Sequence, residues 1–256
     1  MNQLKLFIDL VRLKKPIGYM LLFWPCAWGL TLAYDFSNDL GNYFFYLVLF
    51  FLGSVLMRSA GCIVNDILDK EYDKKVSRTR NRPIASGKIN IKLAIFYTLF
   101  LCFTALFVLL NFNNFTIILA LGSMPLAFTY PLMKRYTYWP QLFLGITFNY
   151  GLILGWTAIK DDEIIGLKST SIKFKSNPII FLIICYSIFY LITLSMGFLM
   201  NLNNLFFFSL AIVFLQIFYF QLKILKINDA KNCLKIFKSN NFLGLLVYFG
   251  IFIGKF

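Results

Sequence analysis

Eleven acidic residues are all that this 256-residue chain contains, and several of them gather in the stretch 65–73. Asn65, Asp69 and Asp73 follow a spacing of four residues, so they line one face if the stretch is helical. Asp66 is adjacent to that face. Oxygen ligands arranged in this way suit Mg²⁺, which keeps several waters and readily binds substrate phosphates.

Three arginines, Arg78, Arg80 and Arg82, follow this stretch almost at once. A guanidinium group grips phosphate oxygens with two parallel hydrogen bonds, while a metal ion neutralises their charge. The competing interpretation is a solvated loop in which acids and lysines alternate for solubility, but such a loop does not require the four-residue spacing. The stretch 65–82 therefore predicts a site for a metal-bound diphosphate.

A second group of acids, Asp161, Asp162 and Glu163, directly follows Lys160. For this group alone, a solvated loop and a functional site explain the residues equally well. The chain contains no histidine and its five cysteines are scattered singly, so a Cys/His zinc site is excluded. Mg²⁺ is the cofactor that we predict.

The acidic groups lie between apolar runs that are long enough to cross a membrane. The chain is 59% hydrophobic and only 14% charged, with a mean hydropathy of +0.73, whereas a soluble domain has about a quarter charged residues. Runs of about 18 to 24 apolar residues recur, and a hydrocarbon core of about 30 Å needs about 20. We predict an all-α polytopic membrane protein with one domain over residues 1–256 and eight spans, at 16–34, 43–66, 91–111, 115–133, 138–159, 178–200, 204–223 and 242–255. The tryptophans are expected near the membrane interfaces: Trp24, Trp28, Trp139 and Trp156.

The net charge of +14 comes mainly from Lys and Arg in short loops between the apolar runs. This is the pattern of the positive-inside rule, and it argues for a lipid bilayer and against a nucleic acid as the partner. Three basic groups are separated by even numbers of spans and therefore share one side, the cytoplasm by this rule: residues 5–15, residues 70–92, and Lys134 with Arg135.

Two later basic groups, at residues 168–175 and 223–238, share a side with each other. Only the span 138–159 separates them from Arg135, so counting spans places both on the opposite side, against the charge bias. Either 138–159 is a re-entrant hairpin, or a helix that one would expect is absent.

The residues around the first acidic stretch match a known pattern. The segments Arg58–Asp73 (RSAGCIVNDILDKEYD) and Arg78–Gly87 (RTRNRPIASG) resemble the first signature of the UbiA-type prenyltransferases. Within that family, the branch that prenylates 4-hydroxybenzoate is the most similar. Further matching segments extend the resemblance over essentially the whole chain: Arg12–Pro25, Tyr130–Gln141, Gly166–Ser171 and Asn228–Gly244.

The resemblance implies nine helices around a central cavity that opens sideways to lipid. It also implies two Asp-rich motifs that face each other at the cytoplasmic side and hold two Mg²⁺ ions on a prenyl diphosphate. Carried over residue by residue, the metal ligands would be Asn65, Asp66, Asp69, Asp73 and Asp162. The catalytic residues would be Asp66, Asp69, Asp73 and Arg135. The residues that contact the diphosphate or the aromatic substrate would be Arg12, Arg82, Lys134, Arg135 and Lys168.

The chain departs from the family pattern at the second motif. Asp162 takes the position of its last acid, but Ala158 stands where the first acid belongs, and the helix that precedes the motif is missing. A helix with its loop, about 30 to 35 residues, would bring the spans to nine and would also repair the placement of the basic groups. The resemblance therefore predicts an internal deletion near Ile159.

The expected activity is transfer of a polyprenyl group from its diphosphate to the ring carbon next to the hydroxyl of 4-hydroxybenzoate, in ubiquinone biosynthesis. One alternative keeps the fold but uses another acceptor: haem, a menaquinone precursor or homogentisate. Others are an inactive shortened relative and a cation-binding membrane protein or transporter. We see no transit sequence at the N-terminus. With the Lys-, Ile-, Asn- and Phe-rich composition, this favours a multi-pass protein of a bacterial inner membrane.

Overall fold

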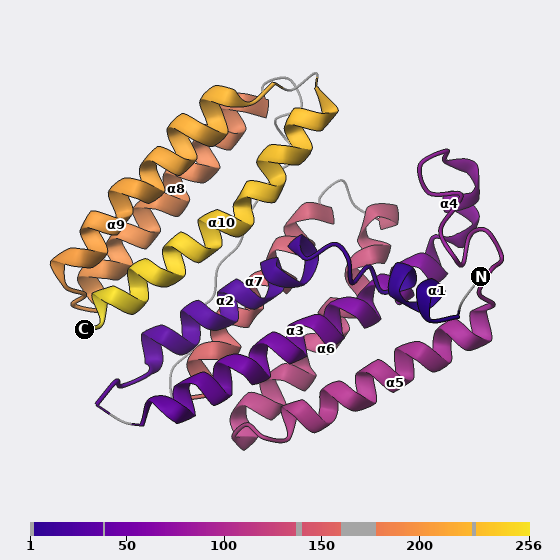
Figure 1. Ribbon diagram of the computed structural model, residues 1–256, viewed down its shortest axis with the longest axis horizontal. Helices are drawn as coiled ribbons and strands as arrows, with labels where there is room; N and C mark the ends of the chain where they lie inside the picture. The colour runs from indigo at the N-terminus through magenta and orange to yellow at the C-terminus, as the bar shows by residue number, and fades with distance from the viewer. Residues whose placement is uncertain (1–2, 38, 137–139, 160–177, 227–228) are drawn as a thin grey trace.

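A computed structural model describes residues 3–37, 39–136, 140–159, 178–226 and 229–256, and these residues form helices without any strand (Figure 1). Each of the eight predicted spans coincides with helical structure, which confirms the all-α prediction. The elements are α1 (Gln3–Leu10), α2 (Ile17–Ala33), α3 (Leu40–Leu68), α4 (Lys70–Lys75), α5 (Ile91–Leu109), α6 (Asn114–Tyr136), α7 (Pro140–Thr157), α8 (Pro178–Leu199), α9 (Asn204–Phe214), the π-helix η1 (Leu215–Lys223) and α10 (Ala230–Gly254).

Five helical segments in the described ranges are long and apolar enough to cross a membrane, at 40–68, 91–109, 182–199, 204–223 and 231–254. Two shorter apolar segments, 17–33 and 114–129, add to them. The chain is therefore a multi-pass membrane protein, whereas the number of eight spans stays a prediction. One boundary was wrong: α10 begins at residue 230, not at 242.

Helices α2 and α7 lie at the centre, with α3, α5 and α6 on one side and α8, α9 and α10 on the other (Figure 1). The backbones of α2 and α7 nearly touch. A Cβ atom at Gly155 would lie 2.1 Å from the carbonyl oxygen of Cys26, and one at Gly29 would lie 2.1 Å from that of Leu152. Small residues four apart, here Gly151 and Gly155, permit such close helix contacts in membranes.

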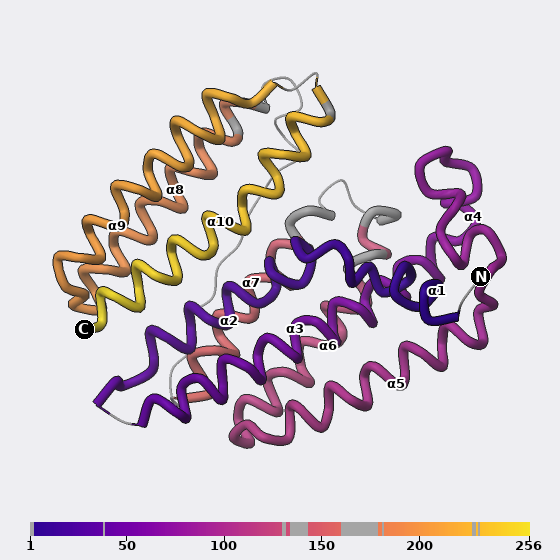
Figure 2. Tube along the Cα trace, viewed as in Figure 1, coloured from indigo at the N-terminus to yellow at the C-terminus, as the bar shows by residue number. Residues whose placement is uncertain are grey.

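The three C-terminal helices lie along one flank of α2, and α10 packs most extensively against it (Figure 2). Trp24 donates from Nε1 to Asn241 Oδ1 at 2.7 Å, and Trp28 donates from Nε1 to the Gly244 carbonyl at 3.1 Å. The side chains of these two tryptophans therefore connect α2 to α10 by hydrogen bonds. Their predicted place at the membrane interface stays a prediction.

The bundle has two ends, which we distinguish by α3. The acidic end is where α3 stops at Leu68, close to Asp66, and the opposite end is where α3 begins near Tyr43. Helix α7 finishes at the opposite end, because the Thr157 carbonyl accepts a hydrogen bond from Asn113, in the connection between α5 and α6. Ala158 packs in the same apolar cluster as Tyr43.

Helix α8, in contrast, begins at the acidic end. Helix α10 runs parallel to α2, from the Trp24 contact to Lys255, whose Nζ donates to the Leu32 carbonyl. The α9–η1 segment runs antiparallel to α10, because Asn203 at its start contacts Gly254. Contacts such as Phe198 with Phe207 show that α8 is antiparallel to α9, so it runs in the direction of α2.

These directions decide between the two explanations for the basic groups. Helix α7 is a single uninterrupted helix, so the re-entrant hairpin was wrong. The described residues on either side of the segment 160–177 lie at opposite ends of the bundle, as they would if one membrane crossing were absent. The basic group at 223–238 lies at the acidic end, together with Arg12, which corrects the placement obtained by counting spans.

The sidedness can be tested by labelling single cysteines in a variant that lacks the five native cysteines. Lys75→Cys and Lys235→Cys are expected to react with a membrane-impermeant maleimide from the same side, and Asn201→Cys from the other side. Labelling is compared between intact cells and inverted vesicles. Reaction of Lys235→Cys from the side of Asn201→Cys would contradict the helix directions.

Substitutions in α7 test the close contact with α2. Gly155→Ala should destabilise the protein by about 1–3 kcal/mol, because the methyl group overpacks the interface. Gly145→Ala in the same helix is the matched control: a Cβ there meets no atom within 4 Å, so it should be neutral or stabilising. The measurement is thermal unfolding in detergent, and equal midpoints for the two variants would refute the packing argument.

Candidate active site

Helix α1 holds one basic side chain at the acidic end. Its buried residues Leu6 and Leu10 pack, together with Val11, against α3 and α5, through Ala60 of α3 among others. Arg12 follows directly with a φ of 56°, a left-handed conformation that is uncommon for a residue with a side chain. The helix therefore stops there, and its apolar face anchors the backbone that carries Arg12.

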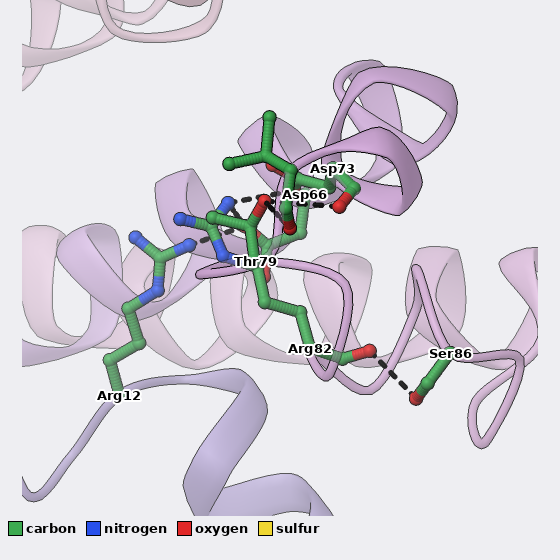
Figure 3. A network of polar contacts seen from close by, with 7 residues as sticks. Arg12, Asp66, Asp73, Thr79, Arg82 and Ser86 are labelled. Atoms are coloured by element: carbon green, nitrogen blue, oxygen red, sulfur yellow. Dashed lines mark hydrogen bonds and ion pairs between the residues drawn. The ribbon is translucent and has the colours of Figure 1, made fainter.

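Asp66 receives two arginines on one carboxylate oxygen. Arg12 donates from Nη2 to Asp66 Oδ1, and Arg82 donates from Nη1 to the same atom at 3.1 Å (Figure 3). Arg82 Nη1 also donates to Asp73 Oδ2, at 2.7 Å. The Asp66 side chain is only 2% exposed, whereas those of Arg12 and Arg82 are 25% and 27% exposed. Two solvent-reaching guanidinium groups thus neutralise a buried carboxylate at the end of an apolar span.

Local hydrogen bonds fold the segment that presents Arg82. Thr79 donates from Oγ1 to the Asp73 carbonyl at 3.0 Å, and Ser86 donates from Oγ to the Arg82 carbonyl at 2.8 Å (Figure 3). Gly87 closes the segment with a φ of 74°, which glycine adopts without steric cost. The sequence between α4 and α5 is thereby held in a defined loop that points Arg82 at both carboxylates.

The acids are not carried by one continuous helix. Helix α3 ends at Leu68, and Asp69 has a φ of −94° and a ψ of 3° before α4 begins. Helix-type hydrogen bonds nevertheless continue across the break, from Asp69 N to the Asn65 carbonyl at 2.9 Å and from Asp73 N to the Asp69 carbonyl at 2.8 Å. Asp69 and Asp73 of the four-residue series are buried, as is the adjacent Asp66, whereas Asn65 is half-buried.

The other acid of the stretch faces solvent. Glu71 accepts a hydrogen bond from Lys74 Nζ at 2.7 Å, and this contact lowers the pKa of the Glu71 carboxyl. The solvated-loop interpretation therefore fits Glu71 but not the three buried aspartates.

The donor types at the acidic end fit a hard divalent cation, because carboxylate and amide oxygens are the protein ligands that Mg²⁺ prefers. In the described part of the chain, however, no three carboxylate or thiol groups converge closely enough to bind a metal ion together. Asp66 and Asp73 converge on arginine instead. The chemical type of these ligands therefore suits Mg²⁺, but the side chains would have to rearrange before they could surround the ion.

An apolar cavity of about 210 Å³ lies along α3 from Leu49 to Gly61, between α2, α5, α6 and α7, on the membrane side of the buried aspartates. Arg58 is the only charged residue among its described lining residues, and its guanidinium lies 5.7 Å from the centre of the Phe148 ring. A Cβ atom at Gly18 would lie 2.8 Å from Arg58 Nε, so glycine there leaves room for the arginine. Charged residues inside membrane spans are costly and usually functional. The position of Arg58 within the apolar run 43–66 was the signal for this residue, which our sequence-based site residues did not include.

The remaining predicted residues are only partly covered by the structure. Lys134 and Arg135 belong to the last turn of α6, which reaches the acidic end because Thr116, near the start of that helix, contacts Thr157. The side chains of Lys134 and Arg135 lie outside the described residues, as do Asp162 and Lys168 entirely. Ala158, by contrast, is described and lies at the opposite end from Asp66. The roles of the predicted site residues therefore stay predictions.

The sequence pattern that describes the UbiA prenyltransferase family matches residues 22–162. Over 97% of its length, the chain is 38% identical to the mitochondrial 4-hydroxybenzoate polyprenyltransferases of Bos taurus and Homo sapiens, and 36% identical to that of Arabidopsis thaliana. It covers 75%, 75% and 68% of those relatives. The alignment with the bovine protein spans 282 positions, whereas 97% of this 256-residue chain is about 248 residues, so about 34 positions have no counterpart here. That length agrees with the predicted deletion of one helix and its loop.

Solved structures share the fold. A UbiA homologue from Aeropyrum pernix K1 in its apo form superimposes with a TM-score of 0.68 at 19% identity, covering 93% of this chain and 97% of that protein. A UbiA homologue from Archaeoglobus fulgidus bound to GPP and Mg²⁺ gives a TM-score of 0.68 at 17% identity, covering 96% and 98%. The fold, the sequence pattern and the relatives that match 97% of this chain all agree, and the chain belongs to the UbiA prenyltransferase family.

Proposed function

We propose that this protein is an Mg²⁺-dependent prenyltransferase that attaches a polyprenyl group to 4-hydroxybenzoate in ubiquinone biosynthesis. The names of its relatives at 36–38% identity over 97% of the chain support this proposal. The observation that carries it is the juxtaposition of three buried aspartates and two arginines with an apolar cavity that contains a single described cation, Arg58. The arginines suit the anionic diphosphate, the apolar cavity suits the isoprenoid chain, and Arg58 suits the carboxylate of the aromatic acceptor.

The acidic end would bind the diphosphate. Arg12 and Arg82 would hold its oxygens, with Lys134, Arg135 and Lys168 as further predicted contacts. Asn65, Asp66, Asp69, Asp73 and Asp162 are the proposed metal ligands. Bound there, Mg²⁺ would neutralise the diphosphate and stabilise the charge that develops as it leaves.

The cavity would bind the isoprenoid chain and the acceptor. Its apolar lining excludes water, which would otherwise quench an allylic cation, and ring faces such as that of Phe148 can stabilise positive charge. Arg58 lies eight residues before Asp66, about 12 Å along α3, and would pair with the acceptor carboxylate. The bond between the prenyl C1 and the diphosphate oxygen breaks, and C1 bonds to the ring carbon next to the hydroxyl. The displaced ring proton then leaves, which restores aromaticity.

The membrane that contains the protein is a separate part of the proposal. The curated relatives named above are mitochondrial, whereas we propose a bacterial inner membrane for this chain from its composition. The basic groups at the acidic end support a cytoplasmic position for the site.

Membranes that contain the chain, supplied with 4-hydroxybenzoate, a polyprenyl diphosphate and Mg²⁺, are expected to form prenylated product. Asp69→Asn should lower the rate by about a hundredfold or more, because it removes the negative charge of a proposed metal ligand. Asp35→Asn, at the opposite end, is the matched control and should retain activity. Product that survives both Asp69→Asn and chelation would contradict the metal-dependent mechanism.

Lack of product from well-inserted protein would refute the activity of this chain as it stands. Activity that returns only when a transmembrane segment is inserted after Ile159 would attribute the loss to the missing crossing.

Arg58→Gln should raise the KM for 4-hydroxybenzoate by about tenfold or more, because a buried charge-assisted contact with the carboxylate is lost. The KM for the polyprenyl diphosphate should change little. The uncharged acceptor 4-hydroxybenzamide provides the control, since it should not distinguish Arg58→Gln from the unmodified enzyme. An equal increase in KM for both acceptors would show that Arg58 does not recognise the carboxylate.

A further inference from the structure

The two arginine contacts at Asp66 compete with the proposed cation for the same oxygen. A carboxylate oxygen has about two acceptor positions, and Asp66 Oδ1 already accepts from both Arg12 and Arg82. Asp73 Oδ2 accepts from Arg82 as well. A cation can therefore use Asp66 Oδ1 fully only if an arginine leaves it.

We propose that Arg12 and Arg82 form an exchangeable clamp, which holds Asp66 and Asp73 and transfers to the diphosphate when the metal-bound substrate enters. The clamp rests on the proposed function, because it assumes that the site binds a metal diphosphate. It adds a positioning role for the two arginines: they keep the acids of the first motif neutralised and oriented until both ligands arrive.

The burial of the four side chains shows which partner can move. Asp66 is 2% exposed and is fixed within α3, and Asp73 is 11% exposed, whereas about a quarter of each arginine side chain reaches solvent. Neither arginine belongs to α3: Arg12 follows α1, and Arg82 comes from the loop after α4. A diphosphate offers a guanidinium group several charged oxygens in a geometry suited to two parallel hydrogen bonds, so it can replace the lost carboxylate contact.

The clamp couples the two ligands energetically. Metal alone must displace arginines that gain no new partner, whereas metal together with diphosphate gives them one. Each ligand therefore strengthens the binding of the other, and by linkage the factor is the same in both directions. Loss of a clamp arginine should have two effects of opposite sign: tighter binding of the metal alone and weaker coupling to the diphosphate.

The test uses the full-length protein purified in detergent and Mn²⁺ as a spectroscopic substitute for Mg²⁺. Free Mn²⁺ is measured by electron paramagnetic resonance, with and without inorganic pyrophosphate. Arg82→Gln and Arg12→Gln should each bind Mn²⁺ alone about tenfold more tightly, because a cation beside the carboxylates is removed. The same variants should lose most of the increase in Mn²⁺ affinity that pyrophosphate causes in the unmodified protein.

Lys88→Gln is the matched control, because Lys88 is exposed in the same loop, has no proposed role in the site and forms no ion pair among the described contacts. Both effects should be absent there. Tighter Mn²⁺ binding with unchanged pyrophosphate coupling would mean that the arginines act only through space, and the clamp would be wrong. Unchanged Mn²⁺ binding would overturn it as well.

Arg82→Lys keeps the charge without the planar fork, so it provides a second variant if Arg82→Gln does not fold. It should leave the binding of Mn²⁺ alone nearly unchanged and still reduce the coupling; full coupling in Arg82→Lys would contradict the exchange. The clamp and the proposed function can fail separately. Normal coupling in Arg82→Gln alongside prenylated product would refute only the clamp, whereas the expected coupling without any prenylated product would refute only the function.

Discussion

The burial of Asp66 is the constraint on which the acidic end depends. A carboxylate that is almost completely removed from water cannot stay ionised without partners, because desolvation costs several kcal/mol. Its partners come from two segments that are remote in sequence, the connection after α1 and the loop after α4. Three features bring two guanidinium groups to this one buried oxygen. Helix α1 folds onto α3 and α5 and positions Arg12. The helix breaks at Asp69, and the hydrogen-bonded loop that follows positions Arg82.

The second structural requirement is close contact between backbones in the middle of the bundle. Gly29 and Gly155 let α2 and α7 approach until no side chain fits between them, and α2 also carries the tryptophans that bind α10. Helix α2 thus connects the half of the molecule that holds the cavity with the three C-terminal helices, and Tyr43 of α3 adds a hydrogen bond to the Tyr248 hydroxyl of α10 at 2.9 Å. This explains how the arrangement of the family persists although about 34 aligned positions are absent: α10 is attached directly to α2.

Much of the fold follows from the sequence because the length of an apolar run determines whether it spans a membrane. That Asp69 and Asp73 share a side of the chain was likewise predictable from a spacing of four residues, whereas their burial and that of Asp66 were not. Other features depend on contacts that spacing does not encode. Trp24 and Trp28 bind another helix, and α10 starts a dozen residues early because Ser239 and Asn240 accept hydrogen bonds from the buried Gln221 of η1. Counting spans failed for the last basic group because it assumes that every crossing is present.

The position of that basic group has an electrostatic consequence. Its exposed lysines Lys231, Lys235 and Lys238 lie at the same end of the molecule as Arg12 and Arg82, so the positive potentials of the two regions add. Diphosphates and hydroxybenzoate are anions, and a surface with an excess of positive charge raises their local concentration and speeds their diffusional encounter with the site. Dissolved salt screens this attraction over about 10 Å. The C-terminal helices therefore contribute to substrate capture through their electric field.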